Sequence, residues 1–510
     1  KGGRMLSKNA IYLLNERYCL PGETPEGVFK RTAEAIAQGD KKFEDKIYNY
    51  MTNGVFLPNS PCLFNAPHGN LHACYTLDIQ DDITSIFKTV SNMAYIFKPG
   101  GGVGINFTPL REKNSPISNG GTSSGVLSFM EVFDKVVDTV KQGGKRRGAL
   151  MGILNYDHPD IFDFIKVKLT GKLQNFNLSI MVKDEFMKLA TDTVSRNGEI
   201  GLISPKSGIQ GFVKARDIFD LICFASWCNG DPALLFFDRI NQDNPFYPNV
   251  KIDVCNPCSE VALPPYSACC LGSINLSKFV IKGEFDFEWF FNTCQLAMRF
   301  LTTMNNISVY PLPEVKERME EYNPVGVGIM GFADCLIKLS IKYDSDECLE
   351  FIKQLGSVYK EATESYDDKF HFYRRIIAPT GSLSILADCS SGIEPIFDTT
   401  FTRSLTIGRI EEVRDLYKSE YVRTAHDVSP EWHVRILSEW QKWVDGGVSK
   451  TVNLPHDASI DDVKSVYTQA WLTGCKGITV YRDGSRNQVL ESNNKPKYKT
   501  GKCSDETCTL

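Results

Sequence analysis

Apolar residues in the first 50 positions recur at the spacing of an α-helix. Those between Ala10 and Leu14 would line one side of a first helix. The pair Thr24-Pro25 is typical of a helix start, which predicts a second helix running to Gln38. Residues 5–50 are therefore expected to form a helical N-terminal region.

The next 90 residues mix strand and helix patterns. Residues 54–110 carry short apolar runs interrupted by proline, glycine and asparagine, which favours strands and loops. Residues 122–142 repeat apolar side chains at helical spacing and are predicted to form a strong helix. Thr122-Ser123-Ser124 would cap this helix, and Gly143-Gly144 would end it.

From residue 150 to residue 485, short apolar runs alternate with helical patterns. This alternation predicts an α/β fold with a largely parallel sheet. From Glu491 onward the periodicity is lost and lysines gather, which predicts a mobile tail. The runs span 234–237, 274–276, 325–329, 376–377 and 477–480, and the helical patterns span 285–305, 346–370 and 461–473.

Composition narrows the class of protein. The 510 residues are 42% hydrophobic and 23% charged, which are ordinary values for a globular chain. The formal net charge of −5 argues against a general nucleic-acid binder. No apolar run approaches the roughly 20 residues of a membrane helix, and residues 1–8 lack a signal-peptide core. A cytoplasmic protein without nucleic-acid or membrane partners is expected, with its 16 cysteines mostly as thiols.

Three glycine-containing segments could contact phosphate groups. Residues 100–104 resemble a dinucleotide loop, but Phe107 breaks the G-x-G-x-x-G pattern, and a tight loop between elements is the simpler interpretation. Residues 141–148 combine glycines with basic side chains, which suits either a nucleotide contact or a solvated helix end. Residues 378–384 follow an apolar run and could hold a phosphate or only cap a helix.

Two groups of cysteines raise the question of metal or redox chemistry. Cys62, His68, His72 and Cys74 lie within 13 residues, but their spacing is not that of a standard zinc site, and no metal is predicted. The Cys255-Asn-Pro-Cys258 segment has the form of a C-x-x-C redox motif. The following Pro264-Pro265 disfavours the long helix of a thioredoxin-like site.

Asn256, Cys258 and Glu260 alternate along the chain. In an extended segment they would lie on one side and would present an amide, a thiol and a carboxylate. A cysteine-rich loop without chemistry is the alternative. Cys503 and Cys508 end the chain, and two thiols on a mobile tail could exchange disulfides with another site or could be incidental.

Taken together, these motifs resemble the catalytic subunit of ribonucleotide reductase. The closest resemblance is to class II, the adenosylcobalamin-dependent form. The resemblance covers nearly the whole chain in order. It is carried by residues 6–10, 58–61, 142–148, 256–260, 269–276, 378–382, 389–395, 424–433 and 476–485, together with Cys74 and the C-terminal cysteine pair.

The resemblance implies a ten-stranded α/β barrel made of two five-stranded parallel halves, with a finger loop inside. The expected domains are a short helical region at 1–55, the barrel with its effector loops at 56–485, and a flexible redox-active tail at 486–510. No ATP-binding cone is expected before residue 6. The segment 369–373 looks shorter than in typical members, and Cys255 and Cys270 are extra thiols that could form competing disulfides.

The resemblance also implies catalytic roles. Cys258 would carry the transient thiyl radical that takes the 3′ hydrogen of the ribose. Glu260 would be the base on the 3′ hydroxyl, and Asn256 would hydrogen-bond the ribose. Cys74 and Cys269 would reduce the substrate and end as a disulfide. Cys503 and Cys508 would then reduce that disulfide and would be recharged by thioredoxin or a similar reductant.

Two nucleotide sites follow from the same resemblance. The substrate would be a ribonucleotide, a diphosphate rather than a triphosphate, and a deoxynucleoside triphosphate effector would select the base, with Arg146 nearest to it. A homodimer is a further implication. The expected substrate contacts are Ser60, Ala73, Pro379, Thr380, Gly381, Ser382 and Ser384, and the expected effector contacts are Asp81, Arg111, Gln142, Lys145, Arg146 and Arg147.

Three functional hypotheses remain at this point. A class II reductase is favoured, because a class I subunit receives its radical through two adjacent tyrosines and Val480-Tyr481 supplies one. A class III enzyme would need a glycyl-radical motif, which Asp483-Gly484-Ser485 is not. A class I-like subunit with a metal-bearing partner is the second hypothesis. A thiol–disulfide oxidoreductase or a degenerate nucleotide-binding protein is the third.

Overall fold

The N-terminal region is helical, as predicted. The computed structural model describes residues 6–118, 120–140, 148–192, 198–367, 369–405, 407–485 and 490–494. Helix α1 (Lys8–Leu13) continues into a π-helical turn (Leu14–Tyr18), and α2 (Pro25–Ala37) and α3 (Lys41–Thr52) follow. Side chains of Ser7, Thr24 and Asp40 accept hydrogen bonds from the first turns of α1, α2 and α3, which explains where these helices begin.

The region 54–110 contains a long helix that the sequence pattern does not reveal. Helix α5 (Ile83–Phe97) begins after Asp82, whose carboxylate accepts a hydrogen bond from Ser85 N–H. Its exposed side carries Ile83, Phe87 and Tyr95, so apolar residues occur on all sides of the helix. The 3.6-residue spacing of its buried apolar residues is therefore hidden in the sequence. The neighbouring elements are β1 (Phe56–Pro58), α4 (Ser60–Asn65), β2 (Cys74–Leu77) and β3 (Gly102–Asn106).

The predicted helix over 122–142 is α6 (Val126–Thr139), and its predicted cap is wrong. The carboxylate of Asp160, from another segment, accepts a hydrogen bond from Val126 N–H at 3.0 Å. The elements that follow are β4 (Leu150–Asn155), α7 (Ile161–Lys166), β5 (Phe176–Val182), α8 (Asp184–Thr191), β6 (Glu199–Ser204), β7 (Gly208–Lys214), α9 (Ala215–Asn229), β8 (Ala233–Phe236), α10 (Phe237–Gln242), β9 (Ala268–Asn275), β10 (Val280–Ile281), β11 (Glu284–Phe285), α11 (Phe287–Ile307), α12 (Pro313–Tyr322), β12 (Val325–Met330), α13 (Phe332–Lys338) and α14 (Asp346–Glu364).

The last quarter of the described chain completes the alternation of helices and strands. Its final strand lies in the segment predicted to be a mobile tail, where residues 490–492 pair with β13. The elements are α15 (Leu383–Ala387), β13 (Thr400–Leu405), β14 (Gly408–Val413), α16 (Pro430–Gln441), β15 (Thr451–Leu454), α17 (Ile460–Leu472), β16 (Gly477–Arg482) and β17 (Leu490–Ser492). No helix in the described ranges is both long and apolar enough to cross a membrane.

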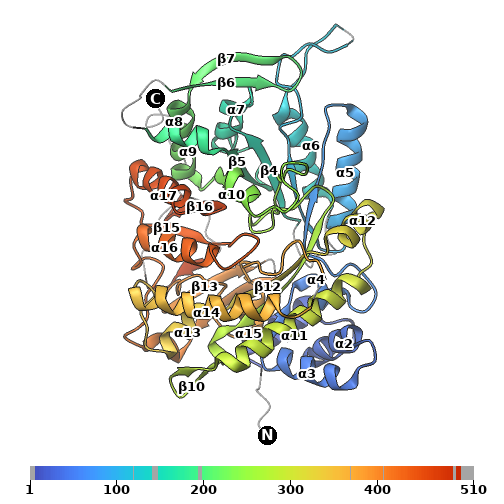
Figure 1. The fold of residues 1–510 in the computed structure, drawn as a ribbon, viewed down its shortest axis with the longest axis vertical. Helices are drawn as coiled ribbons and strands as arrows, with labels where there is room; N and C mark the ends of the chain where they lie inside the picture. Colours follow the sequence, from blue (N-terminus) through green and yellow to red (C-terminus); the bar gives the residue numbers. More distant parts are fainter. Residues whose placement is uncertain are drawn as a thin grey trace.

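Apart from β1, which pairs antiparallel with β9, the main sheet consists of two parallel halves joined antiparallel to each other. Strands β2, β3, β4, β5 and β8 pair in parallel in that order. In the other half, β9 pairs in parallel with β12, and β15 pairs in parallel with β16. Antiparallel contacts of β2 with β9 and of β8 with β16 join the halves, and helices cover the outside (Figure 1).

The segment 374–377 supplies the fifth strand position of the second half. Val327 N–H donates to Arg374 O at 3.0 Å, and Ser449 N–H donates to Ile377 O at 2.8 Å. Parallel bridges join Val327 to Arg375 and Ile377 to Val448. The pairing therefore runs from β12 through 374–377 to the residues before β15, which confirms the prediction of a ten-stranded arrangement in two five-stranded halves.

Both halves of the sheet donate hydrogen bonds to the loop between α10 and β9. Asn106 and Asn177, from the first half, donate side-chain hydrogen bonds to Asp253 O and Pro257 O, each at 2.8 Å. From the second half, the hydroxyl of Tyr373 donates to Ala262 O at 2.7 Å. This is the predicted internal finger loop.

The glycines at 100–104 make room for this finger loop. The sequence suggested a tight connection, but Gly102 and Gly104 belong to strand β3. A Cβ on Gly104 would lie 1.6 Å from Cys255 O, and one on Gly102 would lie 3.2 Å from Pro257 Cγ. The finger loop can cross β3 only because these side chains are absent.

Candidate active site

The tip of the finger loop brings together three of the predicted catalytic side chains. Cys255 and Ala262 form an antiparallel bridge, and Asn256 N–H donates to Val261 O at 3.0 Å. The tip turns between them, and Ser259 adopts a left-handed φ of 69°. The expectation of an extended segment is therefore wrong, because the chain reverses direction. As a result Cys258 is exposed, whereas Asn256 and Glu260 are buried.

Asn256 joins the finger loop to the neighbouring cysteine. Its Oδ1 accepts a hydrogen bond from Val261 N–H at 2.9 Å, which stabilises the turn. Its Nδ2 donates to Cys74 Sγ at 3.1 Å. One amide therefore fixes the loop tip and orients the thiol at the start of β2.

Cys74 and Cys269 are direct partners across an antiparallel pair of strands. Cα atoms in such pairs lie about 4.5–5.5 Å apart, and their side chains share one face. That separation lies within the range for disulfides. Both residues are thiols here, and burial raises the pKa of the Cys269 thiol well above its usual value. The register places a dithiol beside the loop tip.

The additional thiol of Cys270 points away from this pair. Successive residues of a strand face opposite sides of the sheet. Cys270 Sγ contacts Leu301 O at 3.3 Å and Pro324 O at 3.8 Å, on the side covered by α11. The strand geometry separates Cys270 from the dithiol and argues against a competing disulfide there. Cys255 lies buried at the base of the turn, where burial raises the pKa of its thiol.

Glu260 is the buried carboxyl of the site. Desolvation raises its pKa from 4.5 to about 7, only partly offset by backbone hydrogen bonding. Within the described residues, its Oε2 has no hydrogen-bond partner. Gly447 N–H donates to Glu260 O at 2.7 Å, and a Cβ on Gly447 would lie 2.8 Å from Glu260 Cα. The backbone of Glu260 is held closely by Gly447, and its carboxyl can take up or release a proton near neutral pH.

The predicted phosphate loop follows the strand segment 374–377. Ser382 stands at the N-cap position of α15, yet its side chain makes no capping hydrogen bond and instead accepts one from Arg17 Nη1 at 3.0 Å. Thr380 has a left-handed φ of 55°, and its Oγ1 accepts a hydrogen bond from Gly392 N–H at 2.8 Å. Arg403 Nη1 donates to Gly381 O at 3.2 Å, next to Pro379 and Thr380.

The other expected substrate contacts lie near this loop or near the dithiol. Ser60 Oγ lies 2.8 Å from the hydroxyl of Tyr18, the residue after Arg17. Ala73 is buried next to Cys74, and its carbonyl accepts a hydrogen bond from Gly102 N–H. Arg17 and Tyr18 were not identified from the sequence, because their contacts lie 365 and 42 positions away along the chain.

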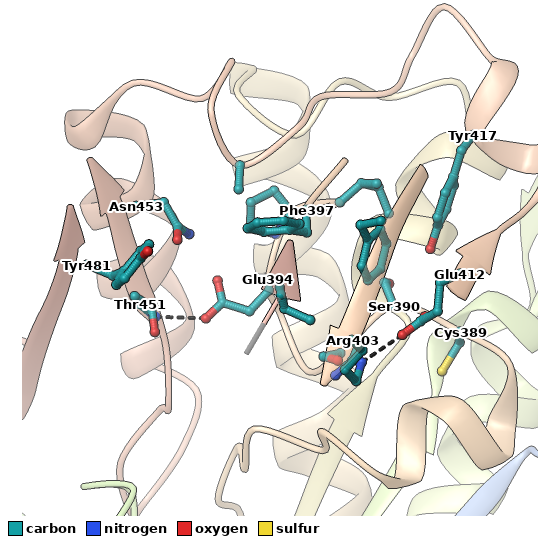
Figure 2. Close-up of a pocket in the computed structure, with 16 residues that line it drawn as sticks. Cys389, Ser390, Glu394, Phe397, Arg403, Glu412, Tyr417, Thr451, Asn453 and Tyr481 are labelled. Atoms are coloured by element: carbon teal, nitrogen blue, oxygen red, sulfur yellow. Dashed lines mark hydrogen bonds and ion pairs between the residues drawn. The ribbon is translucent and has the colours of Figure 1, made fainter. Parts of the chain in front are cut away.

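A cavity of about 290 Å³ adjoins the phosphate loop. Ser391, in its wall, contacts Ser384 through their hydroxyls at 2.9 Å. Figure 2 shows Glu394 directed toward Thr451, whose N–H donates to its carboxylate at 2.7 Å, and Arg403 paired with Glu412. Phe397, Tyr417 and Tyr481 also line the cavity, which was not predicted.

The predicted effector residues within the described ranges, Asp81 and Arg111, form an ion pair away from the phosphate loop. Arg111 Nε lies 2.7 Å from Asp81 Oδ2. Lys206, in the turn between β6 and β7, lies 3.4 Å from the same oxygen and was missed by the sequence analysis. Ser204 of β6 donates to the buried carboxylate of Glu112 at 2.7 Å. Gln142, Lys145, Arg146 and Arg147 lie outside the described residues, as do Cys503 and Cys508.

The cluster considered for metal binding has other contacts. His72 Nε2 lies 2.8 Å from Asn305 Oδ1, and His72 Nδ1 lies 3.0 Å from Ser308 Oγ. Burial lowers the pKa of His72 to about 4. In the part of the chain that the structure describes, no three His, Cys, Asp or Glu side chains are grouped as a metal site would require.

The family models and the relatives that match this chain are all described as ribonucleotide reductases. A family model described as "Ribonucleotide reductase, barrel domain" matches residues 72–365 and 370–481, and "Ribonucleotide reductase, all-alpha domain" matches residues 4–70. The vitamin B12-dependent ribonucleoside-diphosphate reductase of Mycobacterium tuberculosis (strain CDC 1551 / Oshkosh) is 35% identical over 96% of this chain and 81% of that protein.

Two further relatives extend the comparison. A protein of the same name from Thermoplasma acidophilum is 39% identical over 86% of this chain and 65% of its own length. The vitamin B12-dependent ribonucleotide reductase of Streptomyces avermitilis is 26% identical over 90% of this chain and 61% of its own length. The all-alpha model covers α1 to α4, and the barrel model covers the finger loop and both halves of the sheet.

Proposed function

The chain belongs to the ribonucleotide reductase family, and on that premise we propose that it reduces ribonucleoside diphosphates to 2′-deoxyribonucleotides with adenosylcobalamin as cofactor. The observation that carries this proposal is the junction of the finger-loop tip with the dithiol, made by the hydrogen bond from Asn256 to Cys74. The vitamin B12-dependent relatives support the cofactor, and the class I-like alternative is not favoured.

The residues at the loop tip are suited to a radical cofactor. Among the fourteen cysteines of the described ranges, Cys258 alone is exposed, and its thiol can be approached from outside the loop. When bound, adenosylcobalamin supplies an organic radical. Cys258 is the residue that would face it and become the thiyl.

The protein side chains then divide the reaction between them. The Cys258 thiyl takes the 3′ hydrogen, Glu260 accepts the proton of the 3′ hydroxyl, and Asn256 orients the ribose. The 2′ hydroxyl leaves as water with a proton from the dithiol. Two electrons and two protons pass from Cys74 and Cys269 to the substrate, which leaves one disulfide. Glu260 returns its proton to the 3′ oxygen, and Cys258 gives its hydrogen back to C3′ and is again the thiyl.

Turnover requires that this disulfide be reduced again. We assign that step to Cys503 and Cys508 by thiol–disulfide exchange, with thioredoxin or a similar dithiol as the final reductant. The fourteen described cysteines are thiols, the state typical of a reducing compartment, which supports a cytoplasmic location.

A deoxynucleoside triphosphate effector and a homodimer complete the proposal. A cluster of charged side chains lies at one corner, formed by Asp81, Arg111 and Lys206. Asp82, the next residue after Asp81, caps α5. The exposed side of α5 carries Ile83, Phe87 and Tyr95, which supports a contact with a second copy of the chain. Gln142, Lys145, Arg146 and Arg147 are assigned to the effector by resemblance.

The test is an anaerobic assay of deoxyribonucleotide formation with dithiothreitol and an effector. Product should form with adenosylcobalamin and should disappear in Cys258→Ser. Cys19→Ser, which removes a thiol from the N-terminal region, should remain active. Product formed only with a metal-bearing partner would indicate the class I-like alternative. Disulfide exchange without deoxynucleotide would indicate a simple thiol oxidoreductase.

A further inference from the structure

Strand β16 connects the cavity beside the phosphate loop to the tip of the finger loop. Alternate residues of a strand share one face, so Gly477 and Tyr481 face the same side, opposite Val480 in the apolar core. A Cβ on Gly477 would lie 3.9 Å from the Cβ of Ser259, and Tyr481 lines the cavity. Four residues of a strand span about 13 Å. The strand therefore leads over this distance from the neighbour of Cys258 to the cavity.

The size of the cavity suits one part of the cofactor. Its volume of about 290 Å³ lies at the lower end of ligand pockets, which range from roughly 300 to 1,000 Å³. A nucleoside-sized group fits such a space, whereas a corrin ring with its side chains is far larger. Aromatic rings form much of the wall, and these are Phe397, Phe401, Tyr417 and Tyr481. A cavity of this kind is suited to a flat heterocycle.

Asn453 and Phe397 offer the groups that recognise an adenine ring. Figure 2 shows the amide of Asn453 directed into the cavity, without a hydrogen bond to the other residues drawn. An asparagine amide can donate to N7 of adenine while it accepts from the 6-amino group. The ring of Phe397 faces the same space, and stacking of a base on an aromatic ring adds to affinity. The two side chains can therefore bind the edge and the face of one base.

The charged groups beside the cavity favour an uncharged ligand. Lys450, whose side chain is fully buried, donates to Glu394 Oε2 at 2.7 Å. Arg403 pairs with Glu412 at 2.7 Å. Both cations are therefore neutralised by carboxylates, which disfavours a phosphate. The Glu394 carboxylate still has lone pairs for further hydrogen bonds, and the hydroxyls of a ribose are suitable donors.

We propose that the cavity binds the adenosyl group of adenosylcobalamin, with Phe397 on the face of the adenine, Asn453 on its edge and Glu394 on the ribose hydroxyls. The inference rests on the proposed function, because it takes that cofactor as its premise. It gives the part of the cofactor that supplies the radical a site of its own, and the corrin is not assigned to this cavity. An adenine nucleotide carries the same base, so the test must distinguish these two sources.

The test compares the binding of adenosylcobalamin and methylcobalamin by equilibrium dialysis in the dark. The two compounds share the corrin, so the ratio of their dissociation constants reports the adenosyl group alone. The wild-type chain should prefer adenosylcobalamin. Asn453→Leu and Phe397→Leu should each weaken its binding by about 5- to 100-fold and leave the affinity for methylcobalamin unchanged. Asn453→Gln, which keeps an amide, should recover part of the loss.

Phe212→Leu is the control, because this exposed phenylalanine lies on β7 and should leave the preference for adenosylcobalamin unchanged. Equal affinity of the wild-type chain for both cobalamins would overturn the inference. So would variants that keep the preference, or that lose both cobalamins equally, which would indicate a purely structural role.

Two further outcomes separate the sources of the base and the two proposals. If saturating ADP abolishes the preference and both variants bind ADP more weakly, the cavity holds the base of a nucleotide and the inference is wrong. If the variants lose the preference but the wild-type chain makes no deoxynucleotide, the proposed function fails and the assignment of the cavity stands.

Discussion

Burial determines the chemistry of Glu260. Its pKa of about 7 means that the carboxyl changes charge in the neutral range, where a base for a hydroxyl proton is most effective. We expect turnover to rise with pH through about 7, and Glu260→Gln to lose about 10²- to 10⁴-fold in kcat. The pH profile of kcat/KM under anaerobic conditions measures this. Asp253→Asn is the matched control, since that carboxyl lies in the same loop but before its tip.

The same pKa has a consequence for stability. The folded carboxyl holds its proton up to about pH 7, whereas the unfolded one releases it near 4.5. The folded state therefore binds more protons between these values, and stability falls as pH rises through that window. The full shift corresponds to roughly 3 kcal/mol.

Glu260→Gln should consequently gain stability relative to the wild-type chain as pH rises from 5 to 8. Urea unfolding of both proteins at the two pH values gives this difference directly. An equal difference at pH 5 and pH 8 would show that the carboxyl does not titrate in this range. Loss of activity with a gain in stability is the pattern expected of a functional residue held in an unfavourable environment.

At the level of elements, the finger loop depends on strand β3. Gly104→Ala would place a Cβ 1.6 Å from Cys255 O, so the loop must move. We expect a loss of about 1–3 kcal/mol in the free energy of unfolding, together with loss of turnover, because the loop tip shifts relative to Cys74. Gly211→Ala in β7 meets no atom within 4 Å and should change neither quantity. Activity retained in Gly104→Ala would contradict the role assigned to the crossing.

The hairpin of β6 and β7 bears on the effector site. Lys206 shares the carboxylate of Asp81 with Arg111, so its ammonium lies at the proposed effector site. Lys206→Ala should weaken binding of a deoxynucleoside triphosphate by about 3- to 10-fold, measured by equilibrium dialysis. Lys214→Ala, at the far end of β7, is the control. Equal affinities in all three proteins would place the triphosphate elsewhere.

The sequence predicted elements and residue types better than it predicted contacts. The α/β alternation and the set Asn256, Cys258 and Glu260 can be recognised because they depend on local pattern. The turn at Ser259 reverses the extended geometry, and a left-handed φ cannot be inferred from a serine. The role of Gly104 and the contact of Arg17 depend on partners far away in the chain. No local pattern contains that information.

On the scale of the whole molecule, the two halves of the sheet hold the finger loop between them. Asn106 and Asn177 bind it from the first half, and Tyr373 binds it from the second. The dithiol lies at the antiparallel junction of the halves, at Cys74 and Cys269. The proposed radical thiol and the proposed reducing thiols are thus positioned by the same ring of strands, and the proposed effector site lies outside it.

Because the proposed effector site lies outside the ring of strands, we expect the exposed side of α5 to connect that site to a second copy of the chain. Ile83, Phe87 and Tyr95 are between 50% and 61% exposed, and the helix starts next to Asp81. We expect the chain to form a dimer through this surface, and effector binding to strengthen it. A charge in the apolar surface should oppose association, so Phe87→Glu should shift the protein toward monomer in sedimentation velocity experiments with and without the effector.

Leu472→Glu is the matched control, because Leu472 on α17 is also exposed, at 66%, but lies on a different helix. It should sediment as the wild-type chain does. If Phe87→Glu also sediments unchanged, α5 is not the contact surface. If the dimer is lost but effector affinity is unaffected, association and effector binding are independent. A parallel loss of both would establish that the start of α5 couples the nucleotide at Asp81 to the second subunit.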